Sequence, residues 1–254
     1  MDKVTHVITL PSGVECEHTE LTGKEQRLLT EQKGKKMGEQ LNDVILSIVK
    51  RLGDNHSITE QTIKDLLSED RKAILWNARR VSVDGDKFQF KWDYVDTQKK
   101  QQKKDMEVDL VDESFGWKPY KQQVTDYSQL EKKVELTLKK TGKLVRFSLL
   151  DGNGEVIGAA TKKDERSSHT AILMRNPVEF MKGATETIPV RLNLDNLPLT
   201  DIEQLREAIK EHEGKVPTEI RFEHPDIEHK PQHEKYVVVD LLSQLAFFFP
   251  SEAI

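Results

Sequence analysis

The chain has 254 residues and a formal net charge of −5, with 33% charged and 36% hydrophobic residues. The two signs of charge nearly balance, which is typical of a solvated, mixed-charge surface and disfavours a basic nucleic-acid-binding face. A single cysteine, Cys16, excludes an intrachain disulfide bond and a zinc site built from cysteines. We therefore expect no nucleic-acid partner and no cofactor.

Hydropathy places the chain outside the membrane-spanning class. No apolar run reaches the roughly 18 residues that a transmembrane helix needs, so we expect no membrane span. The first ten residues, MDKVTHVITL, are too polar for a secretory signal peptide. These features predict a protein made in the cytoplasm.

The length favours two modules, since domains usually contain roughly 100–200 residues. We predict an N-terminal module over residues 1–112 and a C-terminal module over 134–254. Between them, residues 113–133 lose the apolar periodicity and are expected to form a linker.

The N-terminal module begins with a predicted hairpin over residues 4–16. Thr22 and Glu25 then stand three apart, which is the spacing of a capping box at a helix N-terminus. Apolar residues recur every three or four positions over 28–52, which predicts helix, and two glycines are expected to divide it into two pieces.

Residues 57–83 predict two more helices. Ser57 and Glu60 form a possible capping box for the first, and the second is expected to start near Ser68. The period then changes from helical to alternating, and Asp84-Gly85 predicts a hairpin turn after a short strand.

An aromatic strand should follow this turn. Its alternating aromatic residues are Phe88, Phe90, Trp92 and Tyr94. We expect all four to form a buried face packed on the preceding helix, with a partner strand at 106–110. The Gln/Lys-rich residues between the two strands, 98–104, are interpreted as a solvated loop.

The C-terminal module has several strand patterns and one clear helix. We expect these at 134–149 (a hairpin), 188–194 (a strand), 200–214 (a helix capped by Thr200), and 218–222 and 236–239 (two strands). The predicted fold class is therefore α+β, with N-terminal helices packed on a small antiparallel sheet and a second α+β module rich in β-hairpins.

Three histidines in one loop are the candidate metal ligands. His224, His229 and His233 lie in the sequence FEHPDIEHKPQHE, close to several carboxylates. Zinc binds such side chains, but two prolines in the loop prevent the regular helix on which paired zinc-binding histidines usually lie. We favour an ordinary solvated loop between two strands and expect no metal.

The C-terminal tail is the candidate partner-binding segment. Phe247, Phe248 and Phe249 are consecutive and precede Pro250. Left in water, each phenylalanine would forgo about 1.5–3 kcal/mol of burial. Successive side chains of an extended segment point to opposite sides, so we expect part of this tail to contact another protein. Packing of the whole tail on its own domain is the alternative.

Four stretches of the chain, in this order, resemble the baseplate proteins of contractile-tailed bacteriophages, including the hub and assembly components of the large T-even type. They are LTGKEQRLLTEQKGKKMGEQLNDVILSIVKR, LLSEDRKAILWNARRVSVDGDKFQFKWDY, VELTLKKTGKLVRFSLLDGNGE and FFFP. None is a catalytic motif, so the resemblance rests on their order. The family pattern also places a cysteine-bearing knuckle after the aromatic strand, where this chain has no cysteine.

The resemblance implies a non-enzymatic structural component of the baseplate, associated with its hub or wedges. Its partners would be other phage baseplate or tail proteins, first in the host cytoplasm during assembly and then in the tail baseplate of the virion. A transient assembly chaperone is the closest alternative and would be missing from mature particles. A metal-dependent hydrolase using His224, His229 and His233 is a third possibility, which metal analysis of the purified protein would test.

Overall fold

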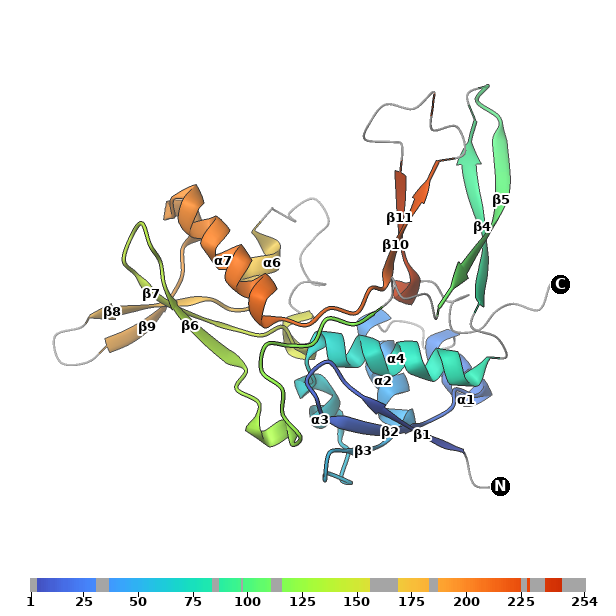
Figure 1. Ribbon diagram of the computed structural model, residues 1–254, viewed down its shortest axis with the longest axis horizontal. Helices are drawn as coiled ribbons and strands as arrows, with labels where there is room; N and C mark the ends of the chain where they lie inside the picture. Colours follow the sequence, from blue (N-terminus) through green and yellow to red (C-terminus); the bar gives the residue numbers. More distant parts are fainter. Residues whose placement is uncertain are drawn as a thin grey trace.

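The computed structural model describes residues 4–30, 37–83, 87–96, 98–110, 116–155, 169–182, 187–224, 228 and 236–243, and its class is α+β, as predicted (Figure 1). Its helices are α1 (Gly23–Thr30), α2 (Met37–Ile48), α3 (Glu60–Asp65), α4 (Ser68–Ser82), α6 (Thr170–Leu173) and α7 (Leu199–His212), with 3-10 turns η2 (Tyr127–Gln129), η4 (Leu194–Asn196) and η7 (Leu241–Ser243). Its strands are β1 (Thr5–Thr9), β2 (Glu15–Thr19), β3 (Val49–Leu52), β4 (Lys87–Val95), β5 (Gln101–Asp109), β6 (Lys133–Thr137), β7 (Leu144–Ser148), β8 (Val178–Lys182), β9 (Thr187–Arg191), β10 (Glu219–Glu223) and β11 (Tyr236–Asp240).

The first hydrophobic core forms where helices α2 and α4 pack against the antiparallel sheet β1-β2-β3 (Figure 1). The apolar stripes of the helices supply Ile45 and Trp76, which are 0% and 2% exposed. Cys16 of β2 is buried in the same core, and burial raises the pKa of its thiol to about 12. The thiol therefore stays protonated and acts as a small apolar side chain.

The second core lies on one face of the sheet β6-β7-β8-β9, under helices α6 and α7 (Figure 1). Val145 and Phe147 of β7 alternate into this core. The Asp201 carboxylate of α7 accepts hydrogen bonds from the amides of Lys140 (2.9 Å) and Thr141 (3.0 Å) in the β6–β7 turn. These bonds fix the helix over the predicted hairpin, which is confirmed.

Two long hairpins, β4–β5 and β10–β11, project side by side from the first core (Figure 1). Their contact is aromatic: Phe90 meets Phe222 edge to face at 5.4 Å between ring centroids, and Tyr94 meets His224 at 5.2 Å. Phe88, at the base of β4, is 1% exposed. The predicted burial of the aromatic face is thus confirmed at its base, whereas Tyr94 is only half-buried and the Trp92 side chain lies outside the described residues.

The segment 116–130, most of the predicted linker, runs against the first core. The amide of Tyr120 donates to the carbonyl of Pro11 (2.9 Å), and that of Val124 donates to the carbonyl of Ser12 (2.9 Å). Tyr120 itself is buried in the second core. Segment 116–130 therefore ties the two cores together.

After α7, residues 216–224 and 236–242 lie against the first core. Val216 and Leu241 are buried there, together with half-buried side chains of β10 and β11. The first core thus combines residues from both ends of the chain. The predicted domain boundaries at 112 and 134 stay a prediction. Each core contains residues from both predicted modules, since Val216 and Leu241 lie in the first core and Leu67 lies in the second.

Two helix starts differ from the predicted ones. The α3 cap is Thr59, whose hydroxyl accepts from the Thr62 amide (3.1 Å), while the Thr59 amide donates to the Thr62 hydroxyl (3.2 Å). Helix α3 is therefore capped by Thr59 and Thr62, and the prediction that Ser57 and Glu60 form its capping box is wrong. Helix α7 begins after Pro198, and Thr200 lies inside its first turn. At Thr22 the glutamate half of the expected box is present, since the Thr22 amide donates to Glu25 Oε2 (2.8 Å), whereas the Thr22 hydroxyl accepts from the Lys24 amide (3.3 Å).

Three strand boundaries also differ. Helix α4 continues to Ser82, so the strand expected before Asp84 is absent from the described residues, and β4 pairs with β5 instead. Residues 49–52, predicted as helix, form β3 because Leu52 pairs with Cys16 of β2. Residues 101–104 are part of β5, so the expected loop is limited to the turn around Lys99.

Candidate functional site

A cluster of buried and half-buried polar side chains surrounds the first turn of α4. Helix α4 starts after Leu67, which has no side-chain cap. Its first amides are satisfied from distant parts of the chain instead: Leu67 donates to the Tyr127 hydroxyl, Ser68 to the Leu150 carbonyl (2.8 Å), and Glu69 to the Tyr120 hydroxyl (3.2 Å). Tertiary contacts therefore fix where this helix begins.

Asp70 occupies the buried side of this turn. Its side chain is 0% exposed, and Oδ1 accepts a hydrogen bond from the Ser12 amide at 2.9 Å. Burial raises the pKa of its carboxyl to about 7, against the opposing effect of the hydrogen bonds from Ser12. Asp70 thus joins the β1–β2 turn to α4 with a group that titrates near neutrality.

Arg71 points away from Asp70 into a separate ionic cluster. Its guanidinium donates to Glu155 and to Asn42 of α2, and the Ser68 hydroxyl donates to the same Glu155 carboxylate. The side chain of Arg71 is 5% exposed and that of Glu155 is 30% exposed. The cluster links α2, α4 and the residues after β7 by charge-assisted hydrogen bonds.

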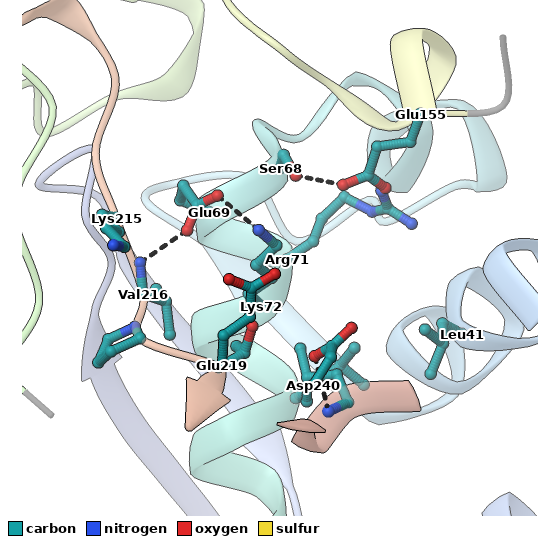
Figure 2. Close-up of a pocket in the computed structure, with 14 residues that line it drawn as sticks. Leu41, Ser68, Glu69, Arg71, Lys72, Glu155, Lys215, Val216, Glu219 and Asp240 are labelled. Carbon is teal, nitrogen blue, oxygen red and sulfur yellow. Dashed lines mark hydrogen bonds and ion pairs between the residues drawn. The ribbon is translucent and has the colours of Figure 1, made fainter. Parts of the chain in front are cut away.

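A pocket of about 420 Å³ opens beside this cluster, between α4, η7 and the chain entering β10 (Figure 2). Glu69 lies at its wall, where Oε1 pairs with Lys72 Nζ (2.7 Å) and Oε2 accepts from the Val216 amide (2.6 Å) (Figure 2). Asp240 lines the other side, and burial raises its pKa. The lining carries both signs of charge, and its charges already have partners. Glu69 pairs with Lys72 and binds the Val216 backbone, and Arg71 is held by Glu155 and Asn42, which is the arrangement of a structural joint.

The candidate metal ligands are not brought together by anything the structure describes. His224 is 6% exposed and stacks edge to face on Tyr94, so it packs as part of the hairpin pair. His229 and His233 lie outside the described residues, as do Phe247, Phe248, Phe249 and Pro250. Among the residues that are described, no three His, Cys, Asp or Glu side chains gather closely enough to hold a metal ion.

Most of the residues that build this cluster were not predicted from the sequence. Asp70 and Arg71 stand together in the printed chain and suggest helix-start charges, yet their side chains enter two different networks. Tyr120 and Tyr127 lie in a polar connection, where a large aromatic residue with a hydroxyl is itself a signal for a buried anchor. The sequence around Ser12 predicts a turn and gives no sign that the Ser12 amide binds a buried carboxyl.

Comparison with known proteins adds no relative: no family model, no curated protein and no solved structure matches this chain. Within the described part of the chain, none of the helices has the length and apolar character needed to cross a membrane.

Proposed function

We propose that the protein is a non-enzymatic structural component of a contractile-tail baseplate, which binds neighbouring baseplate proteins as the tail assembles. The order of the four resembling stretches supports the baseplate, and the paired charges around α4 suit a structural joint. The observation that carries the binding role is an exposed apolar surface on the hairpin β8–β9.

This surface, the β8–β9 face, consists of Met181, Ile188 and Val190, which are 54%, 55% and 40% exposed. Met181 pairs with Ile188, and Val190 pairs with Glu179, which in turn pairs with the buried Val145. Directly paired residues point to the same side of a sheet, so the three exposed side chains continue the face that α6 and α7 cover elsewhere. Adjacent apolar side chains on an uncovered sheet face are typical of an interaction surface.

The edge strand β9 favours contact through side chains rather than by strand addition. Hydrogen-bonded and non-hydrogen-bonded residue pairs alternate along an antiparallel ladder. The Leu192 amide donates to the Pro177 carbonyl, so Leu192 and Pro177 form a bonded pair. Pro189 and Phe180, three positions further along, are therefore a non-bonded pair. The nitrogen of Pro189 therefore faces the free edge of the sheet, and it carries no N–H that could bind an added strand. We propose that a neighbouring subunit of the particle covers the β8–β9 face with apolar side chains.

Ile188→Lys is expected to abolish or strongly reduce incorporation into particles while changing the free energy of unfolding by no more than about 0.5 kcal/mol. The physical reason is that a lysine is tolerated on a half-exposed strand but opposes burial against a partner. Incorporation is measured by mass spectrometry of purified mature particles, and stability by urea denaturation of the isolated protein.

Val7→Lys is the matched control, because Val7 is 58% exposed on β1, at another part of the molecule (Figure 1). It should incorporate normally. Normal incorporation of Ile188→Lys would remove the β8–β9 face from the proposal, and absence of the wild-type chain from mature particles would replace the structural role by that of an assembly chaperone.

The tail with Phe247, Phe248 and Phe249 is proposed as a second contact. Deleting residues 246–254 is expected to lower incorporation and to preserve the melting temperature of the isolated protein, since the apolar side chains would be lost from the interface and not from a core. Thermal denaturation and the particle inventory are read separately. Equal loss of both would show that the tail belongs to its own domain.

A further inference from the structure

Asp70 differs from the other carboxylates of the α4 cluster in having no cationic partner among the described residues and no exposure to water. Its Oδ1 binds the Ser12 amide, whereas its Oδ2 and the Ser12 hydroxyl oxygen are both buried without a hydrogen-bond partner among the described residues. A carboxylate only accepts hydrogen bonds, but a protonated carboxyl also supplies one donor. Burial of the carboxyl away from water favours the neutral acid, and hydrogen bonds from Ser12 and from the Tyr127 hydroxyl act in the opposite direction without outweighing it.

Among the described residues, no group that faces Asp70 supplies a positive charge to balance an ionised carboxylate, although the Tyr127 hydroxyl is a hydrogen-bond donor to it. The facing groups are Cys16 from β2, Tyr120 and Tyr127 from segment 116–130, and Glu69 on the same helix turn. Burial, aided by the nearby Asp70 charge, raises the pKa of the thiol to about 12 and holds those of both phenols well above their ordinary value, so all three stay neutral. Glu69 adds a like charge, and the neighbouring guanidinium of Arg71 is turned toward Glu155.

Three segments meet at this point. The β1–β2 turn contributes Ser12, α4 contributes Asp70, and segment 116–130 contributes the two tyrosine hydroxyls that accept from the first α4 amides. Segment 116–130 also binds the backbone of the β1–β2 turn through the amides of Tyr120 and Val124. These contacts together hold the β1–β2 turn, α4 and segment 116–130 at one junction.

We propose that Asp70 is a pH-responsive latch, which as the neutral acid closes the junction of the β1–β2 turn, α4 and segment 116–130, and which loosens that junction when it ionises. This device is independent of the proposed baseplate function. Ionisation places a charge where neither water nor a cation stabilises it, and the junction can lower that cost by letting water reach the Asp70 carboxylate.

The pH window follows from the carboxyl pKa of about 7 in the folded protein, against 3.8 as its ordinary value. Because the folded state binds the proton more tightly, the stability that this proton contributes is complete below about pH 4 and is lost progressively as pH rises to about 7. Each pH unit inside that window changes the folding equilibrium by about tenfold.

Asp70→Asn tests the latch, because asparagine keeps an acceptor for the Ser12 amide, supplies a donor and does not titrate. We expect the variant and the wild type to be about equally stable below about pH 4, the variant to be about tenfold ahead in folding equilibrium at pH 5, and this lead to grow by roughly another 100-fold between pH 5 and pH 8. Asp54→Asn, at an exposed residue, should track the wild type at both pH values. A constant ratio between wild type and Asp70→Asn from pH 5 to pH 8 would overturn the proposal.

Amide hydrogen exchange on the wild-type protein gives a test that does not depend on the variant folding. After correction for the intrinsic pH dependence of exchange, the amides of Ser12, Leu67 and Glu69 should lose protection by about tenfold or more between pH 5.5 and pH 8. The amides of the β6–β7 hairpin serve as the internal reference. Equal changes in protection at the junction and in that hairpin would show that no local latch exists.

Discussion

Phe88→Ala is expected to lower the free energy of unfolding by about 3–5 kcal/mol, which is a large part of the roughly 5–15 kcal/mol that stabilises an ordinary domain. Phe88 is 1% exposed and packs in the first core with Ile74 and Leu75 of α4. Truncation removes its transfer free energy and leaves a cavity at the base of β4. The loss should appear as a lower urea midpoint or as insoluble protein.

The same strand provides a graded series of controls. Phe90 is half-buried against Phe222, so Phe90→Ala should cost less than Phe88→Ala. Tyr94, further toward the tip, is half-buried against His224, and Tyr94→Ala should cost the least. Three equal losses would contradict the anchoring of this hairpin at its base, and so would an unchanged melting temperature for Phe88→Ala.

The alternating apolar patterns predicted the β6–β7 hairpin and the β4 strand correctly, because the residues that form a hairpin are close together in the sequence. The β6–β7 hairpin was predicted from alternating apolar residues on both sides of Thr141-Gly142, and Gly142 has the positive φ of 67° that such a turn favours. The aromatic alternation of β4 was equally clear. In both elements the side-chain period and the turn chemistry indicate the same structure.

Residues 49–52 show where local pattern fails. Ile48 and Leu52 are four apart, which fits a helix, yet Val49 and Leu52 belong to a strand because β2 offers a partner for them. Tertiary pairing outweighs the weak helical preference of a segment this short. The α4 cluster is harder still, since Ser12, Asp70 and Tyr127 are about 57 residues or more apart along the chain and no local period relates them.

The second large effect is expected at the joint between α7 and the β6–β9 sheet. Glu213, which ends α7, forms two parallel hydrogen bonds with the Arg175 guanidinium, one of them 2.6 Å from Nε to Oε1, and it also accepts from the Leu150 amide (3.0 Å). The exposed fractions of the two side chains are 9% for Arg175 and 13% for Glu213. Glu213→Ala leaves a buried guanidinium without its counter-charge, which typically costs about 3–5 kcal/mol.

Glu211→Ala is the matched control, two residues earlier on the same helix. Glu211 pairs with Lys121 at 2.6 Å, but their side chains are 61% and 52% exposed, so we expect its loss to cost less than about 1 kcal/mol. The double variant Arg175→Met/Glu213→Leu should recover much of the stability lost in Glu213→Ala, because it removes the unpaired charge as well as the pair. Urea denaturation of the four proteins measures the difference. If Glu213→Ala proved no more costly than Glu211→Ala, or the double variant were no better than Glu213→Ala, the buried charge would not be what holds α7 to the sheet.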